Sequence, residues 1–525
     1  MQLFITSYPP LLLLVVLFLA LLLQLLGYQR CQDPRKQPHA HGLKVYPLLG
    51  TLPHLVKNRY RFLEWLTGVL QRSPTHTMSY KALGFGGGVI TANPANIEHI
   101  LKTNFGNYPK GEATASMVED LLGGGIFNSD GEQWLRQRKD ASHEFSTRSL
   151  RAFIADAVRF EVAQRLLPLL GRAARDGRTL DVQDVLERFA FDNICSVAFD
   201  EDPACLAEGH GDHEGTQSSA VEFMRAFDDA QNVLIVRLMS LPRSLWWVKR
   251  LLNAEPERRM RAALGKIRDY TDRIFRERRE RLEAGLARSD DLVSRLAARR
   301  EHSDESLRDV VTSFLLAGRD STSSALSWFF WLVSGRSDVE DRIVREIRTV
   351  RESSSGSAAV DAVSTGTSTP PTSFSLDELR DMHYLHAAIT ESMRLYPPVS
   401  INTRRCERDE FLPDGTFVGR GWQVSYSAYA VARVADVWGD DCEEFRPERW
   451  LDGGGVFRPE SPFKYPVFHA GPRTCLGKEM AYVQMKSIVA CVFERFTLRF
   501  VGDEDQRPGL ALAITLRMKD GLPMQ

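Results

Sequence analysis

The most informative stretch of the sequence is Phe468-His-Ala-Gly471-Pro-Arg473-Thr-Cys475-Leu-Gly477. It presents one cysteine on a loop that is bracketed by glycines and leads into a helical pattern, Lys478 to Phe493. Glycine lets a backbone turn tightly and approach a flat macrocycle, and the first amide N–H groups of a helix lower the pKa of a nearby thiol. Arg473 can meet an anionic group on the edge of such a ligand. The loop therefore predicts that Cys475 is a thiolate ligand.

The spacing Phe-x-x-Gly-x-Arg-x-Cys-x-Gly specifies five residues across ten positions, so chance matches are rare. A buried structural cysteine at a helix start is the alternative. The stretch resembles the haem-binding loop of cytochromes P450. That resemblance implies a mainly α fold with small β-sheets, and haem b (iron protoporphyrin IX) as the cofactor. It also implies that Cys475 is the axial iron ligand and that Phe468 and Arg473 contact the haem.

Length and composition indicate one large domain. The 525 residues exceed the ~250–300 residues of a single simple core, but no change in composition divides the chain. We expect a catalytic domain over residues 55–525. With 67 Lys and Arg against 68 Asp and Glu, the net charge of −1 excludes a general attraction to nucleic acid. The seven cysteines show no paired spacing, which favours a reducing compartment.

Residues 1–29 carry no charge and are mostly apolar, which is enough to cross ~30 Å of hydrocarbon as a helix. A cleaved signal peptide is the alternative, but a basic segment is missing before the apolar run. Cations follow the run at Arg30, Arg35 and Lys36, so the positive-inside bias places the later residues in the cytosol. We expect a single-pass anchor and, over residues 30–54, a basic, proline-rich hinge. Both resemble those of microsomal P450s, which implies the endoplasmic reticulum membrane.

Trp134 and Arg138 are four residues apart and share one face of an expected helix, where both can reach a carboxylate. Without the family resemblance this pair would be an ordinary helix surface. The resemblance implies that both contact a haem propionate. Arg136 and Lys139 add positive charge that can receive an acidic electron-donor domain, although a solvated basic face has the same composition.

Val310 to Ser334 is apolar on every side and predicts a helix through the centre of the domain. Its middle, Ala317 to Thr322, combines a glycine, a carboxylate and hydroxyls, so the helix can open there and relay protons. The segment resembles the oxygen-activation motif of P450s, which implies a catalytic role for Asp320, Ser321 and Thr322. Ser321 replaces the usual threonine, which puts the efficiency of coupling in doubt. Ordinary bonding of Ser and Thr hydroxyls to helix carbonyls is the alternative.

Glu391 and Arg394 lie three residues apart on a helix that ends at two prolines, and Arg449 follows before the cysteine loop. Their order matches the structural triad of P450s, so the resemblance implies that Glu391, Arg394 and Arg449 hold the loop in place rather than take part in chemistry.

Three segments lie outside these motifs. Residues 351–375 are rich in Ser, Thr, Gly and Pro and predict a disordered surface loop. Gly84–Gly88 lies between two strand patterns, as a hairpin turn does, and does not fit a nucleotide-binding loop. Phe223 to Trp247 is either the roof of the substrate pocket, in contact with the membrane, or plain apolar core.

Five stretches narrow the resemblance to the plant fatty-acid ω-hydroxylase group of P450s: Asn107–Gly111, Gly125–Gly131, Ala141–Phe145, Ala317–Asp320 and Phe468–Lys478. This implies a monooxygenase that uses O2 and electrons from NADPH–P450 reductase to hydroxylate the terminal carbon of a lipophilic chain. A fatty acid is the favoured substrate. The alternatives are a sterol side chain (C26-type oxidation) and a jasmonoyl–amino acid conjugate. A membrane-tethered haem electron carrier or sensor is the alternative from another class.

Attack on a terminal methyl group requires a narrow apolar channel that admits the chain end-on. By the same resemblance, the walls of this channel are Ile126, Phe127, Phe314, Ala317, Val399, Ile401 and Ile514. Each of these residues is equally compatible with plain core.

Overall fold

The computed structural model describes residues 43–44, 46, 50–82, 86–146, 148–207, 214–239, 245–284, 304–358, 373–503 and 506–525. The expected anchor, residues 1–29, and most of the expected hinge lie outside these ranges. Within them, every helix is too short or too polar to cross a lipid bilayer.

Helices dominate the described ranges, as expected. They are α2 (Leu52–Lys57), α3 (Phe62–Arg72), α4 (Pro94–Glu98), α5 (Glu112–Leu122), α6 (Gly131–Ser146), α7 (Arg148–Glu161), α8 (Leu167–Asp176), α9 (Val182–Phe199), α10 (Glu214–Met239), α11 (Leu245–Leu251), α12 (Glu257–Glu283), α14 (Asp304–Leu315), α15 (Ser321–Ser334), α16 (Ser337–Ala358), α17 (Leu376–Asp381), α18 (His383–Leu395), α19 (Ala428–Val431), α20 (Ala435–Trp438) and α21 (Lys478–Phe493). The strands are β1 (Thr77–Ala82), β2 (Gly86–Thr91), β3 (Leu180–Asp181), β4 (Ile401–Arg405), β5 (Glu410–Phe411), β6 (Phe417–Val418), β7 (Gln423–Ser427), β8 (Leu510–Leu512), β9 (Leu516–Met518) and β10 (Pro523–Met524).

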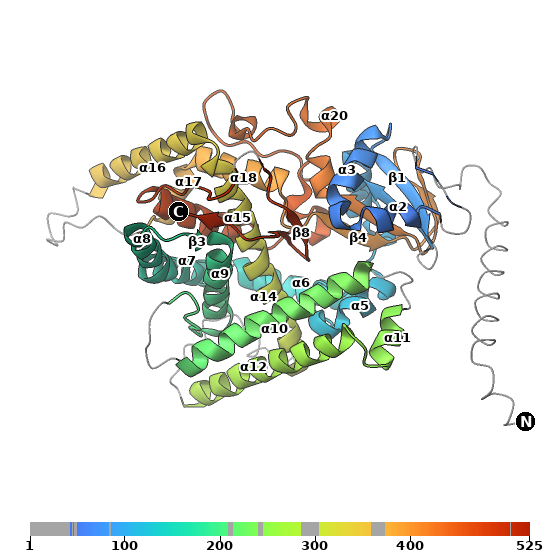
Figure 1. Ribbon diagram of the computed structural model, residues 1–525, viewed down its shortest axis with the longest axis horizontal. Coiled ribbons are helices and arrows are strands. Elements are labelled where there is room, and N and C mark those ends of the chain that lie inside the picture. Colours follow the sequence, from blue (N-terminus) through green and yellow to red (C-terminus); the bar gives the residue numbers. More distant parts are fainter. Residues whose placement is uncertain are drawn as a thin grey trace, which may run out of the picture.

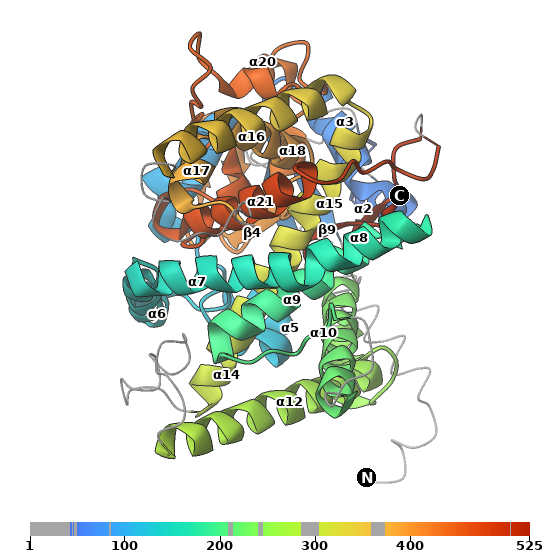
Figure 2. The ribbon, with the colours of Figure 1, turned by 90° about the vertical axis from the view of Figure 1, so that its left-hand side faces the viewer.

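The central helix is formed by α14 and α15, joined by a π-helical turn, Leu316–Asp320 (η6). In Figure 1 it runs from α10 and α12 up to α16 and α18. Figure 2 shows α7, α8 and α9 crossing between these two groups of helices. Because α15 is surrounded on all sides, Trp328, Phe329 and Phe330 are all buried. The prediction of a helix through the centre of the domain is therefore confirmed, and its regular α-helical geometry is interrupted around Gly318.

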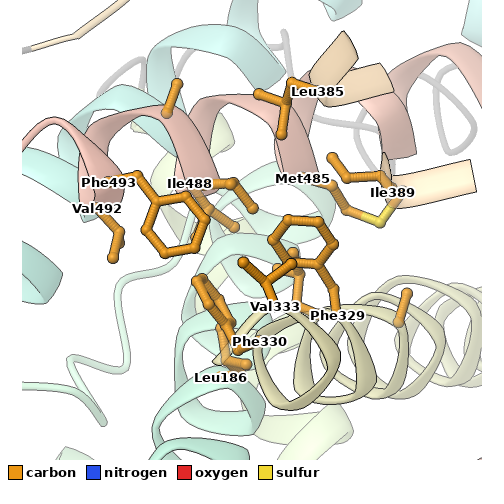
Figure 3. Packing of buried hydrophobic residues seen from close by; sticks show 14 of the residues in the cluster. Leu186, Phe329, Phe330, Val333, Leu385, Ile389, Met485, Ile488, Val492 and Phe493 are labelled. Atoms are coloured by element: carbon orange, nitrogen blue, oxygen red, sulfur yellow. The ribbon is translucent and has the colours of Figure 1, made fainter. Parts of the chain in front are cut away.

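The main apolar core lies where α15, α18, α21 and α9 meet (Figure 3). Each fully buried Leu, Ile, Met or Phe contributes roughly 1.5–3 kcal/mol relative to an exposed one. The side chains at its centre are Leu186, Phe329, Phe330, Val333, Leu385, Ile389, Met485, Ile488, Val492 and Phe493. This packing fixes the position of α21, which begins directly after the cysteine loop.

The largest sheet has the strand order β1-β2-β7-β4. Strands β1 and β2 pair antiparallel, as the hairpin prediction requires, while residues 83–85 of the turn lie outside the described ranges. Strand β2 needs its glycines because neighbouring rings lie against it. A Cβ at Gly87 would lie 2.2 Å from the Trp422 ring, and one at Gly88 would lie 2.3 Å from the Tyr80 ring.

The expected loop over residues 351–375 is wrong at its start, because α16 continues to Ala358. Arg351 is held there by Glu494 at 2.8 Å and lies 3.5 Å from the centroid of the Phe374 ring. Ser353 donates a hydrogen bond to the Thr349 carbonyl at 2.9 Å. These contacts stabilise a helix that composition alone does not predict, and residues 359–372 lie outside the described ranges.

Residues 223–247 contribute both to the core and to the cavity lining, and their contact with the membrane stays a prediction. Phe223 and Leu234 of α10 are buried in a core shared with α12, whereas Leu238 lines the cavity described below. On α11, Trp247 is 59% exposed.

Candidate active site

The cysteine loop is shaped by tight backbone contacts. Gly471 has φ of 67°, and a Cβ there would lie 2.0 Å from the Leu101 carbonyl oxygen, so only glycine fits. The Cys475 N–H donates to the Phe468 carbonyl at 2.8 Å, and α21 starts three residues later. Cys475 is exposed, whereas the other cysteines in the described ranges are buried. The loop thus presents a single sulfur atom to a cavity.

Two opposing effects act on the Cys475 thiol. Although Cys475 is open to the cavity, the surrounding protein shields it from bulk water and raises the pKa of its thiol, while the Gly477 N–H and the charges of Arg138 and Lys478 lower it. The expected effect of the helix start is present. Burial is the largest of these effects, so the thiol pKa is raised overall.

The cavity that Cys475 faces has a volume of about 800 Å³. Its lining includes all seven residues expected to form the channel: Ile126, Phe127, Phe314, Ala317, Val399, Ile401 and Ile514. It also includes Trp134, Arg138, Phe468 and Arg473. These residues come from segments far apart in the sequence, and the structure brings them to one apolar space with the sulfur.

The π-helical turn places two of the three expected catalytic residues at the cavity. Ser321 and Thr322 line it, and the Ser321 hydroxyl donates to the Ala317 carbonyl at 2.5 Å. Gly318 lies close to α9, where a Cβ would lie 2.8 Å from Ile194 Cδ1. Asp320 is buried and points elsewhere, with its Oδ2 accepting from Gln231 Nε2 at 2.9 Å. The hydroxyls and the carboxylate therefore do not face the same space.

Arginine and tryptophan side chains pack together beside the loop. The Arg473 guanidinium lies 4.4 Å from the centroid of the Trp134 ring, and its Nη2 donates to Asp130 Oδ1 at 2.7 Å. The Lys110 and Gly111 N–H groups donate to the same carboxylate at 3.0 and 3.1 Å. Asp130 thereby joins the loop after Asn107 to the cysteine loop.

Sequence reasoning missed Arg404, which is buried in β4 and whose Nη2 lies 3.4 Å from His469 Nε2. The Nε and Nη1 atoms of Arg404 and the Nε of Arg473 are buried without a hydrogen-bond partner. Lys110 is a neighbour, and burial together with Arg404 and Arg473 holds its pKa well below the usual range. A cation within an otherwise regular strand was the only signal for Arg404.

We call Lys110, Arg138, Arg404 and Arg473 the cation cluster. Burial together with the charges of Arg404 and Arg138 lowers the pKa of Arg473, and Asp130 is the neighbouring acid of Lys110, Arg404 and Arg473. Buried N–H groups on a cation require acceptors, and carboxylates are the strongest that biology offers. The cluster therefore fits a ligand that carries carboxylates.

The predicted triad is assembled away from the cavity. Glu391 accepts from Arg394 Nε and Nη2 at 2.7 and 2.9 Å and from Arg449 Nε at 3.3 Å. Trp450 Nε1 donates to it as well, at 2.9 Å. Glu391 and Arg394 are fully buried. This geometry suits the scaffold role that was expected for these residues.

A family model described as Cytochrome P450 matches residues 41–520. The chain belongs to the cytochrome P450 family. Within that family it is similar to Cytochrome P450 CYP94D108 of Paris polyphylla, at 44% identity over 95% of this chain and 93% of that protein. Cytochrome P450 94B1 of Arabidopsis thaliana is 41% identical over 91% of this chain and 90% of its own. Cytochrome P450 94A2 of Vicia sativa is 41% identical over 92% and 90%.

This membership confirms the predicted fold and enzyme class over an electron carrier or sensor. P450 enzymes are monooxygenases that use haem iron, O2 and electrons from a redox partner, and they act on lipophilic substrates. The residues present fit haem. Cys475 would hold the iron, and the cation cluster with Trp134 would hold the propionates, whose carboxylates supply the missing acceptors. When bound, haem supplies the activation of O2.

Proposed function

We propose that this cytochrome P450 hydroxylates the terminal carbon of a fatty acid. Electrons would come from NADPH–P450 reductase. Residues 1–29 would anchor the protein in the endoplasmic reticulum membrane, with the catalytic domain, residues 55–525, in the cytosol. The resemblance of five stretches to plant fatty-acid ω-hydroxylases supports this proposal. The observation that carries it is the distribution of charge along the cavity.

The walls around the expected haem position are apolar. Phe314 and Ala317 on the central helix, Val399 after α18 and Ile514 between β8 and β9 all line the cavity. These four side chains offer no partner to a polar group, so an alkyl end is the part of a substrate that suits them. Secondary C–H bonds are weaker than those of a terminal methyl group. The walls would therefore have to keep the penultimate carbon away from the reacting position.

A cation lies at the exposed end of the lining. Arg59 is exposed, and its guanidinium donates only to the Val56 carbonyl at 3.2 Å and to the Tyr60 hydroxyl at 3.0 Å. Among the described residues, no carboxylate forms an ion pair with it. Of the lining cations, the others, Lys110, Arg138 and Arg473, belong to the cation cluster. Arg59 is thus suited to a substrate carboxylate, which a fatty acid has and a sterol hydroxyl does not provide.

The test is turnover of a mixed panel of lauric acid, a jasmonoyl-isoleucine and 22-hydroxycholesterol with the reductase, read by mass spectrometry. We expect lauric acid hydroxylated at its terminal carbon. Turnover of the sterol alone would contradict the fatty-acid proposal. Hydroxylation mainly in mid-chain would contradict end-on binding, and NADPH oxidation without any product would contradict monooxygenation of these lipids.

Arg59 can be tested with a matched neighbour. Arg59→Gln should raise KM for lauric acid roughly two- to fivefold, the range of an exposed ion pair, and leave KM for dodecanol unchanged. Arg61→Gln is the control, because Arg61 is also exposed, donates to Asn58 Oδ1 at 3.0 Å and does not line the cavity. Equal effects of Arg59→Gln on the acid and the alcohol would show that Arg59 does not bind the carboxylate.

The thiolate assignment has a separate test. Cys475→His should move the Soret band of the reduced, CO-bound protein, because the axial ligand sets its position. An unchanged band would exclude Cys475 as the ligand.

A further inference from the structure

A second buried group of charges lies against the central helix, outside the cavity. We call it the carboxylate cluster: Glu187 (α9), Asp228 (α10), Arg319 and Asp320 (η6) and Arg517 (β9). Arg319 donates to both oxygens of Asp228, at 2.9 and 3.2 Å, and its Nη1 lies 3.4 Å from Asp320 Oδ1. Its Nη2 lies 3.7 Å from Glu187 Oε2. Arg517 forms an ion pair with Glu187 and reaches Asp228 at 3.6 Å.

The charges in this cluster do not balance. Three carboxylates face two guanidinium groups, so full ionisation would leave one negative charge in a largely buried site. Burying an uncompensated charge is costly, and such a site takes up a proton instead. Asp320 Oδ1 is buried without a hydrogen-bond partner, so it is one atom that can receive this proton. Protonation of a carboxyl group removes most of the cost of burying its charge.

The members of the cluster differ in their access to solvent. The side chain of Asp320 is 2% exposed, whereas those of Glu187 and Asp228 are 12% and 27% exposed. Burial raises the pKa of Glu187 to about 7, against the lowering effect of Arg517 and Arg319, while Asp228 and Asp320 raise it further. Burial also raises the pKa of Asp320. An exchangeable proton therefore has an inner site and an outer site within one cluster.

We infer that the carboxylate cluster stores one exchangeable proton for the reaction in the cavity and is recharged from solvent through Glu187. The stored proton starts on Glu187 and passes to Asp320. Asp320 then turns away from Gln231 and releases this proton toward the Ser321 hydroxyl, which leaves all three carboxyl groups ionised. Glu187 takes up a proton from water, and the cluster returns to its starting charge. This inference rests on the proposed function, because hydroxylation consumes two protons with two electrons per O2.

Glu187→Gln is the decisive variant. It keeps the size of the side chain and leaves two carboxylates facing two guanidinium groups, so we expect a folded protein. Infrared spectra of the full chain, recorded against pH without substrate, should show a protonated carboxyl that titrates near pH 7 in the wild type and is missing in the variant. Under turnover, kcat should fall about tenfold. That is less than the ~10²–10⁴-fold of a general acid in direct contact, because water still recharges Asp320 slowly.

The pH profile adds a readout that a structural role would not move. In the wild type, kcat should decrease as pH rises through about 7, since Glu187 then loses its proton. This limb should vanish in Glu187→Gln and return in Glu187→Asp. Glu161→Gln is the matched control: burial raises the pKa of Glu161 to about 8, and its neighbours Asp192, Arg165 and Asp202 are not part of the carboxylate cluster. This control should lose a different infrared band and keep the kcat profile.

Two results would overturn the inference. One is a wild-type spectrum without a carboxyl band that Glu187→Gln removes. The other is a Glu187→Gln variant that has lost the band but retains the wild-type kcat and pH profile, which would make the cluster purely structural. If no lipid is hydroxylated, the proposed function fails, while the infrared titration still decides whether the cluster stores a proton.

Discussion

Two buried groups of arginines in this P450 differ in where their hydrogen-bond acceptors come from. Around Glu391, the protein supplies every acceptor that Arg394 uses: the Glu391 carboxylate and the carbonyls of Ala432, Cys442 and Glu444. In the cation cluster, Arg404 leaves Nε and Nη1 without a partner. Arg394 and Arg404 are equally buried. The comparison teaches that a closed set of charges stabilises the fold, while an open set marks the place of a ligand.

The largest effect on stability should come from removing Glu391, the carboxylate that Arg394 and Arg449 share. Glu391→Ala leaves two arginines without their shared carboxylate, and breaking a buried network in this way costs ~3–5 kcal/mol, a large part of a typical ~5–15 kcal/mol stability. We expect little folded, haem-loaded protein, measured by urea unfolding and haem content. Asp377→Ala is the control, because Asp377 and its partner Arg380 are 86% and 76% exposed, and it should change neither quantity. A well-folded Glu391→Ala with full haem would place the support of the cysteine loop elsewhere.

The carboxylate cluster differs from the cation cluster because it has one more acid than it has arginines. This excess acid predicts that the free energy of unfolding depends on pH. The Glu187 pKa is raised to about 7, so the folded state holds a proton that the unfolded state releases near pH 4.5. The unfolding free energy should therefore fall as pH rises from about 4.5 to about 7 and be flat above, by roughly 3 kcal/mol in total. Urea unfolding at several pH values should show this slope in wild-type protein. Glu187→Gln should remove it, and an identical slope in both would assign it to other groups.

Removing Arg404, a cation without a full set of acceptors, should affect stability and haem affinity in different directions. Arg404→Met eliminates a buried charge whose N–H groups are unsatisfied, so the haem-free protein should be as stable as wild type or more so. Its haem affinity should fall about tenfold, roughly 1.4 kcal/mol, because a propionate loses its partner.

Arg433→Met is the matched control for that experiment. Arg433 is also buried, but it donates to the Leu395 and Tyr429 carbonyls at 2.7 and 3.0 Å. It should destabilise the haem-free protein without a selective loss of haem. If Arg404→Met instead destabilises the haem-free protein and binds haem normally, the cation cluster stabilises the fold, as the charges around Glu391 do, and does not bind a ligand.

The two types of charge group also differ in how far sequence reveals them. The helix Lys478–Phe493 and the pairing of Glu391 with Arg394 are local patterns, and the structure has both. Arg404, Lys110 and Arg319 were missed because their importance depends on burial and on partners far away in the sequence. Nothing near Arg319 in the chain predicts that Asp228 and Glu187 meet it. Likewise, α16 extends to Ala358 because Arg351 finds a partner more than a hundred residues away.

The smallest effect concerns the link between the carboxylate cluster and the cavity. Ser321 lines the cavity next to Asp320, and its hydroxyl donates to the Ala317 carbonyl. Ser321→Thr adds a methyl group that restrains the side-chain rotamer, an effect of roughly 0.5 kcal/mol or about twofold. We expect product per NADPH to rise by up to that factor. Ser321→Ala should lower it and increase peroxide release, because the proton supply is interrupted. Thr322, which also lines the cavity, can replace Ser321 in part, so the decisive variant is Ser321→Ala combined with Thr322→Val. Unchanged coupling in this double variant would mean that protons from the carboxylate cluster reach the cavity without either hydroxyl.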